Sequence, residues 1–315
     1  MSLEGCAFDD VLLKPQLGVL ASRKDADISV KSFGLNIPLI AAPMPSVAST
    51  NLIREITRLG GMGVVHRMNR TEEQQISDYE NSYVHPPVAI GLDEDIPILI
   101  DYGVKSFVLD VAHAHSSPVL DLIREIKKRF PEIFLTAGNI ATSDGAFALA
   151  EAGADAIKVG IGPGHVCTTR QVTGFGVPQL QAIEESSRIV RSNYFKREIP
   201  VIADGGIRNS GDIVKALAAG ADAVMIGSLF ARSIEAGNGG VYWGNASSFV
   251  NNYWAPEGMH VNFVEPPEPL EDIVKRLSWG IRSGISYAGA TNIAELRENA
   301  EWIRISDAGR KESKL

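Results

Sequence analysis

From residue 37 onward, short apolar runs alternate with longer segments of helical spacing. Near-continuous apolar runs are typical of strands buried on both faces, the condition of strands in a parallel sheet. Pro38 is tolerated only near the start of a strand, so we expect the first strand to begin at Leu39. The eight runs cover residues 37–42, 63–66, 87–91, 106–110, 133–137, 156–160, 200–203 and 223–227.

The segments between the runs carry helix signals. Ser116-Ser117-Pro118 and Thr142-Ser143-Asp144 place capping side chains, and in the first case a proline, where a helix begins. Residues 269–283 have the spacing of an amphipathic helix, and residues 292–299 predict a short final one.

The sequence contains an internal repeat of one structural unit. Residues 137–160 and 203–227 both read strand, glycine-rich turn, helix, Ala-Gly-Ala-Asp-Ala, strand. A repeated βα unit within eight strands predicts an α/β fold, the (β/α)8 TIM barrel. The alternative, an open dinucleotide-binding sheet, needs Gly-x-Gly-x-x-Gly after an early strand, whereas Gly160–Gly164 comes late and has another spacing. We therefore expect a single barrel domain over residues 1–315.

Three segments fall outside this rhythm. Phe8-Asp9-Asp10-Val11-Leu12-Leu13, within residues 1–36, predicts a lead-in strand or hairpin. Residues 229–268 are rich in Gly, Asn, Trp, Tyr and Pro, and we expect an irregular active-site flap there, because barrel active sites lie beyond the carboxyl ends of the strands. Residues 306–315 predict a disordered tail.

Composition narrows the class of protein. The 315 residues are 45% hydrophobic and carry a formal charge of −8, which disfavours duplex nucleic acid as a partner because phosphate binding needs a basic face. No signal pattern or membrane-length apolar run is present, so we expect a soluble, cytoplasmic protein without membrane contacts. The two cysteines, Cys6 and Cys167, make no disulfide framework and fit a reduced compartment.

The stretch from Gly160 to Arg170 is the strongest candidate for chemistry. Its three glycines and one proline let the backbone approach a ligand closely. A lone cysteine is by default buried and inert. At the end of such a loop, after a barrel strand, Cys167 is instead predicted to be a nucleophile, which requires access and a lowered pKa. Cys6 is predicted to be structural.

Two further strand ends suit a phosphate ester. Barrels often bind phosphate with the loops after strands seven and eight, where this chain has Asp204-Gly205-Gly206 and Gly227-Ser228. Their backbone N–H groups are free of bulky side chains; plain turn glycines are the alternative. Asp204 would suit a ribose diol as acceptor.

Two other features carry weaker signals. Glu257, in a Pro-Glu-Gly turn, is a candidate proton carrier together with the Thr169 hydroxyl, against the alternative of a solvated loop. His113 and His115 follow the fourth strand; their spacing suggests a metal pair, but no third ligand is near in sequence, which favours the polar lining of a cofactor pocket.

These residues in this order resemble the inosine-monophosphate dehydrogenase and guanosine-monophosphate reductase family over roughly residues 6–304. The Gly-Ile-Gly-Pro-Gly stretch followed by Cys-Thr-Thr-Arg is the most specific part. The matching segments are Phe8–Leu13, Ala137–Asn139, Gly160–Gly164, Cys167–Arg170, Thr173-Gly174, Gly176–Gln179, Asp204–Gly206, Gly227-Ser228, Glu257-Gly258 and Gly280–Ser283.

The resemblance implies a homotetrameric barrel that binds a purine mononucleotide and a nicotinamide cofactor. Cys167 would attack purine C2, and Thr169 and Glu257 would transfer protons. The substrate would contact His165, Asp204, Gly205, Gly206, Gly227, Ser228, Tyr242, Gly244, Asn245, Ala246 and Ser247. The cofactor would contact Asp110, Ala112, His113, Gly138, Asn139 and Gly160. Backbone carbonyls of Gly162, Gly164 and Cys167 are a candidate K⁺ site.

The resemblance alone leaves two branches. Dehydrogenases usually carry an inserted domain pair after the second strand and an Arg-Tyr flap that activates water. Here residues 67–87 leave no room for the insertion, and residues 244–257 contain no arginine. We therefore expect an NADPH-dependent reductase that converts GMP, or a close analogue, to IMP and ammonia. The alternative is a minimal IMP dehydrogenase using NAD. Two segments, His113-Ala114-His115 and Ile207–Ser210, are more similar to the dehydrogenase branch than to the reductase branch.

A reading of another class is a purine-nucleotide-binding protein that has lost turnover. Three departures from the family pattern bear on the substrate. His165 stands in place of a serine, Pro45 in place of an aspartate, and Asn245 in place of a methionine. Together they suggest an altered nucleotide, such as a deoxynucleotide or a modified purine.

Overall fold

The computed structural model describes residues 2–248, 250, 256–263 and 265–313. Among them, seven parallel strands form one sheet in the order β2-β8-β7-β6-β5-β4-β3. Each strand coincides with a predicted apolar run, and the first does begin at Leu39 as expected. The strands are β2 (Leu39–Ala41), β3 (Val88–Ile90), β4 (Ser106–Asp110), β5 (Phe134–Ile140), β6 (Ala156–Val159), β7 (Val201–Asp204) and β8 (Ala223–Ile226).

Residues 62–65 close the sheet between its two edges. The Met62 amide donates to the Leu39 carbonyl (3.1 Å), and the Val65 amide donates to the Pro87 carbonyl (2.9 Å). The regular strand predicted over residues 63–66 is therefore reduced to isolated bridges to β2 and β3. A Cβ on Gly63 would lie 2.8 Å from the backbone of Ile53, so this segment is pressed against a helix. The ring is the predicted (β/α)8 barrel.

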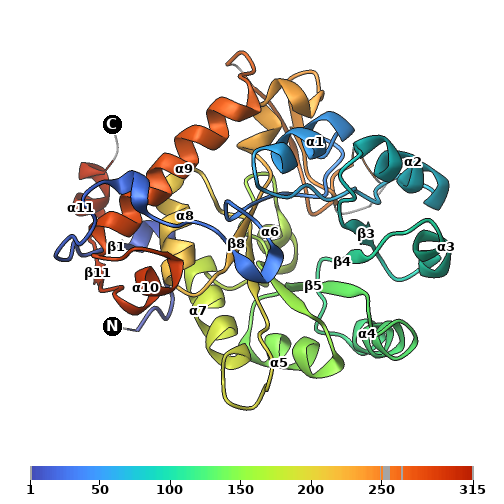
Figure 1. Ribbon diagram of the computed structural model, residues 1–315, viewed down its shortest axis with the longest axis horizontal. Helices are drawn as coiled ribbons and strands as arrows, with labels where there is room; N and C mark the ends of the chain where they lie inside the picture. Colours follow the sequence, from blue (N-terminus) through green and yellow to red (C-terminus); the bar gives the residue numbers. More distant parts are fainter. Residues whose placement is uncertain (1, 249, 251–255, 264, 314–315) are drawn as a thin grey trace.

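Helices surround the strands, as Figure 1 shows along the barrel axis. Thr142 caps α5 by accepting a hydrogen bond from the Gly145 amide (3.2 Å), as its position predicted. The predicted starts near Ser117 and Asn292 are confirmed. The helices are α1 (Thr50–Arg58), α2 (Glu72–Ser82), α3 (Ile96–Asp101), α4 (Ser117–Arg129), α5 (Ser143–Ala152), α6 (Thr169–Thr173), α7 (Gln179–Val190), α8 (Ser210–Ala218), α9 (Leu270–Tyr287) and α10 (Ile293–Glu298).

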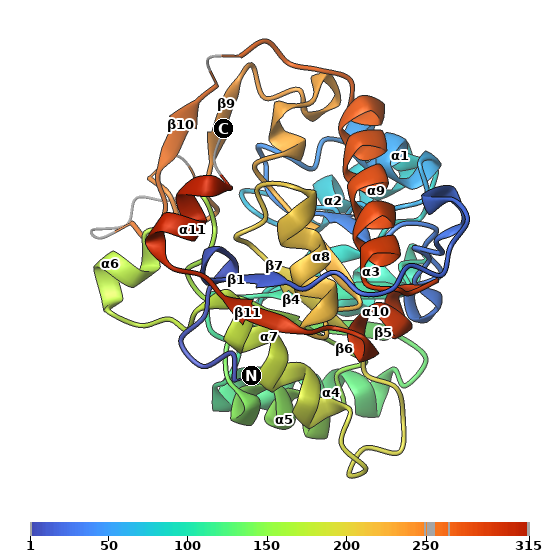
Figure 2. The ribbon, with the colours of Figure 1, turned by 90° about the vertical axis from the view of Figure 1, so that its left-hand side faces the viewer.

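The two ends of the chain meet outside the barrel. The predicted lead-in strand, β1 (Val11–Leu13), pairs antiparallel with β11 (Trp302–Arg304), a partner that the sequence pattern did not indicate (Figure 2). The prediction of a disordered tail is wrong for the helix α11 (Asp307–Glu312). Ser306 caps it by accepting from the Gly309 amide (3.2 Å), and Arg310 pairs with Asp307 (2.7 Å). Residues 314–315 lie outside the described part.

The segment after β8 is largely irregular, as expected, but it contains an antiparallel ribbon. In this ribbon β9 (Val241–Trp243) pairs with β10 (His260–Asn262). Residues 249, 251–255 and 264 of the predicted flap lie outside the described residues.

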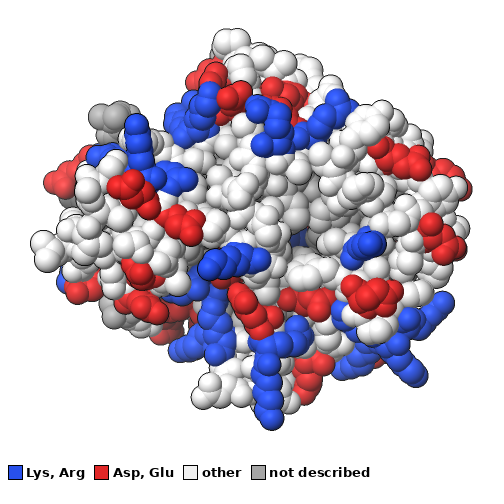
Figure 3. All heavy atoms as spheres, in the orientation of Figure 1, with Lys and Arg blue, Asp and Glu red and all other residues white. Residues whose placement is uncertain are grey.

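The described helices include none that is long and apolar enough to span a bilayer. On the face in Figure 3, acidic and basic side chains are interspersed around the rim of the barrel.

Candidate active site

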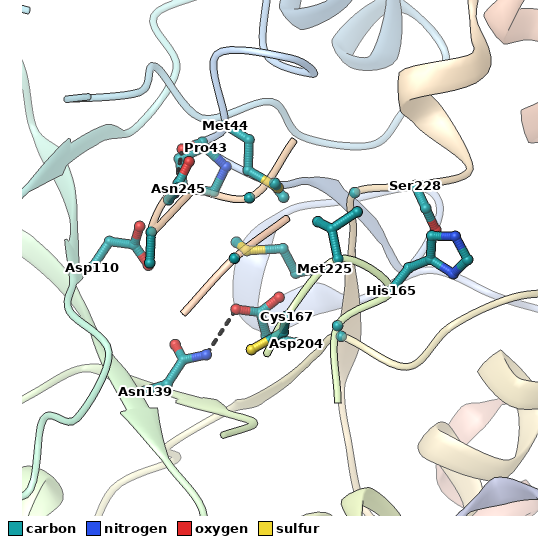
Figure 4. A pocket seen from close by; sticks show the side chains of 18 of the residues that line it. Pro43, Met44, Asp110, Asn139, His165, Cys167, Asp204, Met225, Ser228 and Asn245 are labelled. Atoms are coloured by element: carbon teal, nitrogen blue, oxygen red, sulfur yellow. Dashed lines mark hydrogen bonds between the residues drawn. The ribbon is translucent and has the colours of Figure 1, made fainter. Parts of the chain in front are cut away.

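A cavity of about 610 Å³ opens among the loops that follow the barrel strands. Figure 4 shows Asp110 and Asn139 on one side and His165 and Ser228 on the other, with Cys167 and Asp204 between them. The lining combines the loops after β2, β4, β6, β7 and β8 with Asn139 of β5, residues 67–69 and the ribbon. It includes Pro43, Met44, Arg67, Asp110, Ala112, Asn139, Gly164, His165, Cys167, Asp204, Gly205, Gly206, Gly227, Ser228, Tyr242, Gly244, Asn245, Ala246 and Glu257.

The three predicted catalytic residues come together. The Cys167 thiol is half-buried and lies 3.2 Å from the Thr169 hydroxyl. The Thr168 amide donates to the Glu257 carbonyl (2.8 Å), and Cys167 forms a bridge with Gly258. Backbone hydrogen bonds therefore hold the glycine loop against the Pro-Glu-Gly turn, although nearly ninety positions separate them in sequence. The other cysteine, Cys6, is buried in the core, where burial raises the pKa of its thiol.

The side of the cavity for which phosphate binding is predicted consists of backbone with little side-chain bulk. Gly205 and Gly206 have φ of +90° and +81°, which favours glycine. Gly227 packs against Tyr242, because a Cβ there would lie 2.5 Å from the Tyr242 hydroxyl oxygen. Tyr242 is 4% exposed, and burial, reinforced by Asp204 and Cys167, raises its pKa. The phenol therefore stays neutral and able to donate.

The residues predicted to contact the base lie next to β2 and β9. The Asn245 amide nitrogen donates to the Pro43 carbonyl (3.3 Å), which fixes the direction of the side chain. Its amide oxygen is buried and has no hydrogen-bond partner among the described residues. The Ser247 hydroxyl is likewise buried and unpartnered among them. Pro45 is absent from the lining, to which its neighbours Pro43 and Met44 contribute.

Several predicted contact residues do not line the cavity. His113 is exposed and meets His115 edge to face, with ring centroids 6.4 Å apart. Gly160 provides close packing, because a Cβ there would lie 2.0 Å from the Asp204 carbonyl oxygen. Thr169, Gly138, Gly162 and Ser247 also lie outside the lining, Thr169 in contact with the thiol. Among the described residues, no cluster of three His, Cys, Asp or Glu side chains could hold a metal.

Of the three candidate K⁺ ligands, Gly164 and Cys167 line the cavity, and the Gly164 carbonyl accepts from the Cys167 amide (3.1 Å). The loop that carries these carbonyls is fastened by Arg170, which donates to the carbonyls of Ile161 (3.4 Å) and Val177 (2.6 Å).

Two basic residues escaped the sequence analysis. Lys158, on β6, is 1% exposed and lies beneath the cavity, 2.7 Å from Asp110 and 3.0 Å from Asp204. Arg67 lines the cavity, where its guanidinium donates to the Asp110 carbonyl (3.1 Å) and pairs with Glu94 (3.3 Å). For Lys158 a signal existed, since a lysine inside an otherwise apolar strand requires a buried partner.

Comparison with known proteins shows the family to which the chain belongs. A family model described as the IMP dehydrogenase / GMP reductase domain matches residues 5–315. An inosine-5'-monophosphate dehydrogenase of Aquifex aeolicus is 45% identical over 252 residues, which cover 71% of this chain and 50% of that protein. One of Halalkalibacterium halodurans is 41% identical over 250 residues, 72% of this chain and 50% of the relative.

The chain thus spans about half the length of these two relatives. A shorter inosine-5'-monophosphate dehydrogenase, of Borreliella burgdorferi, is 32% identical over 393 residues, with 98% of this chain and 96% of the relative covered. The chain belongs to the IMP dehydrogenase / GMP reductase family, and so to a family of oxidoreductases that act on purine mononucleotides.

Proposed function

We propose that this protein oxidises IMP to XMP, with NAD as the hydride acceptor and Cys167 as the nucleophile. The observation that carries the proposal is the Cys167 thiol, 3.2 Å from the Thr169 hydroxyl, in a cavity that Asp204 and the glycine turns also line. The sequence analysis put GMP reduction first. The names of the relatives favour the dehydrogenase reaction instead.

The cavity offers suitable groups for each part of the nucleotide. The amides of Gly206, Gly227 and Ser228, with the His165 side chain, suit the 5'-phosphate. Asp204 keeps one carboxylate oxygen for ribose hydroxyls. The buried amide oxygen of Asn245, with Gly244 and Ala246 beside it in the lining, suits an N–H edge of the base.

The opposite side fits a nicotinamide cofactor. Asp110 and Asn139 line the cavity with oxygen and amide groups that suit ribose hydroxyls, and Ala112 leaves space beside them. When bound there, the cofactor supplies a hydride acceptor. The side chains of this chain bind it, orient it and hold the nucleotide against it.

In the proposed reaction the Cys167 thiolate adds to C2 of the purine and forms a C–S bond. C2 then loses its hydrogen with both electrons, and the C2–N double bond is restored. Water adds to C2, the C–S bond breaks, and XMP leaves with the thiolate regenerated. Thr169 Oγ1, beside the sulfur, and the Glu257 carboxylate are the candidates to remove the protons of the water.

GMP reduction with NADPH is the second candidate, and one feature favours it. Residues 244–260 contain no arginine or lysine that could activate water. In the reductase reaction the thiolate adds to C2, and the 2-amino group takes up a proton and leaves as ammonia. A hydride then arrives at C2, and the C–S bond breaks to release IMP and the thiolate. That sequence needs no activated water.

Two parallel assays separate the candidates. The purified protein is incubated with IMP and NAD, and with GMP and NADPH, while absorbance of the reduced cofactor and the nucleotide products are followed. XMP with NADH supports the proposal, and IMP with ammonia supports the reductase. Cys167→Ala should abolish either reaction, with nucleotide affinity changed by no more than about tenfold. Nucleotide binding without turnover in either assay leaves a binding protein.

Three further properties are proposed on the family resemblance. A homotetramer is expected in sedimentation velocity. Replacing K⁺ by Na⁺ should lower the turnover rate if the glycine-loop carbonyls bind the cation. A thermal-shift series over ribo- and deoxynucleotides tests whether His165 and Asn245 accompany an altered substrate.

A further inference from the structure

Lys158 crosses the floor of the cavity from one half to the other. Its ammonium nitrogen contacts Asp110 Oδ1 (2.7 Å), Asp204 Oδ2 (3.0 Å) and the Asn139 side-chain oxygen. The Asn139 amide in turn donates to Asp204 Oδ2 (2.9 Å) and to the Gly160 carbonyl (2.7 Å). Four consecutive strands, β4 to β7, thus contribute one polar side chain each to a single buried network.

The register of the strands explains how a lysine reaches so far. Asp110, Gly138, Lys158 and Ile202 occupy one row across β4, β5, β6 and β7. A Cβ on Gly138 would lie 2.6 Å from the Lys158 Cβ. Since Gly138 has none, the lysine side chain passes over β5 and reaches Asp110 two strands away.

Each of the two carboxylates uses only one of its oxygens to contact Lys158. Asp110 gives Oδ1 and Asp204 gives Oδ2 to Lys158, and the structure shows no hydrogen bond to the second oxygen of either among the described residues. Both residues line the cavity; in Figure 4 Asp204 lies beside Cys167 and Asp110 lies on the side of Asn139. Burial by itself lowers the pKa of Lys158, but the two carboxylates outweigh it and raise the pKa, so the lysine remains charged.

We propose that Lys158 is a positioning residue that sets both halves of the site at once. It holds the free oxygens of Asp204 and Asp110 toward the nucleotide ribose and the cofactor ribose, respectively. This inference rests on the proposed function in one respect, that both ligands bind in this cavity. Without the ammonium, two half-buried carboxylates lose their common cation, and each loses the contact that fixes its rotamer.

The test measures binding and does not depend on turnover. The probes are IMP and NAD, titrated separately by calorimetry into the full-length wild-type protein and into Lys158→Met, well below the melting temperature. Lys158→Met should weaken both ligands by about tenfold or more, because each loses a charged hydrogen-bond acceptor in the right place. Lys158→Arg, which keeps the cation, should recover part of both affinities.

Lys127→Met is a matched control. Lys127 pairs with Asp155 (2.9 Å) and also donates to the carbonyls of Pro131 (3.1 Å) and Ile133 (2.6 Å), at the amino-terminal end of the strands. Its loss should lower the melting temperature and leave both dissociation constants unchanged. If Lys158→Met behaves like this control, or weakens only one ligand, the inference is overturned.

A second variant covers the case in which Lys158→Met does not fold. In Asp110→Asn, Lys158 keeps Asp204 as its only carboxylate partner, and that tighter pair makes Asp204 a poorer acceptor. The affinity for IMP, measured without cofactor, should then fall several-fold although Asp110 belongs to the cofactor side. An unchanged IMP affinity overturns the inference. Failure of the wild-type protein to bind any purine nucleotide would instead overturn the proposed function.

Discussion

The side chain of Asn245 is the strongest candidate for discrimination between purine bases. Its amide nitrogen is held by the Pro43 carbonyl, and its buried oxygen lacks a partner among the described residues. An unpaired buried acceptor costs roughly 1–3 kcal/mol, which a ligand donor can recover. A 6-oxopurine offers the N1–H group, whereas N1 of a 6-aminopurine is itself an acceptor.

We therefore expect Asn245→Leu, which keeps the size of the side chain, to weaken IMP binding by about tenfold. The free protein should be as stable as the wild type or more so, since the unpaired oxygen is removed. Calorimetric titration with IMP and thermal melts without ligand measure the two effects. An unchanged dissociation constant for IMP would show that the oxygen does not read the base.

At the scale of elements, the sequence correctly predicted the strands and helices that are marked by local patterns, such as an apolar run or a capping residue. Apolar runs located seven strands, and Thr142 and Asn292 marked helix starts correctly. The prediction of a regular second strand over residues 63–66 was wrong. Gly61 and Gly63 allow α1 to pack closely against residues 62–65, and two isolated bridges take the place of a regular ladder. The ribbon β9–β10 and the pairing of β1 with β11 depend on contacts between distant segments, which periodicity does not encode.

The close packing of the glycine turn after β8 leads to a prediction for the nucleotide affinity of a Gly227 variant. In Gly227→Ala the new methyl would meet the Tyr242 hydroxyl at 2.5 Å. The Tyr242 ring, which lines the cavity, must shift, and we expect nucleotide affinity to fall at least tenfold. Removing the hydroxyl relieves most of the conflict, because the next atoms to the same position are the flexible Met44 Sδ at 3.2 Å and Tyr242 Cζ at 3.4 Å.

The double variant Gly227→Ala/Tyr242→Phe is the control, compared with Tyr242→Phe alone. Nucleotide affinity should be similar in these two proteins and higher than in Gly227→Ala. Equal losses in the single Gly227 variant and the double variant would contradict the steric explanation.

At the scale of the whole molecule, the site is an assembly of loops brought together by barrel closure. Sequence reasoning identified Cys167, Asp204 and Glu257 because each stands in a distinctive local motif. It missed Lys158, whose role appears only when four strands lie in register, and it placed His113 in a pocket that this exposed side chain does not line. A motif can be recognised from neighbouring residues in the sequence, whereas the burial of a side chain depends on how distant segments pack in the fold.

Burial also sets the acid stability of the whole fold through His66. This side chain is 6% exposed at the closing segment of the barrel, its Nδ1 atom is unpartnered among the described residues, and burial, assisted by Arg70, lowers its pKa from 6.5 to about 4. Between these values the unfolded chain binds a proton that the folded protein does not. Stability is therefore unaffected above pH 6.5 and is lost as the pH falls toward 4, by about 1.4 kcal/mol per pH unit.

Replacing His66 by glutamine removes this titration. In urea unfolding measured between pH 4 and 8, His66→Gln should lose less free energy of unfolding than the wild type as the pH falls below 6.5. Its stability at pH 8 should be within the range of an ordinary buried polar substitution. The exposed His115 is the control, and His115→Gln should follow the wild-type curve. Parallel curves for all three proteins would mean that His66 takes up its proton without unfolding the barrel, and that the segment closing the sheet admits water.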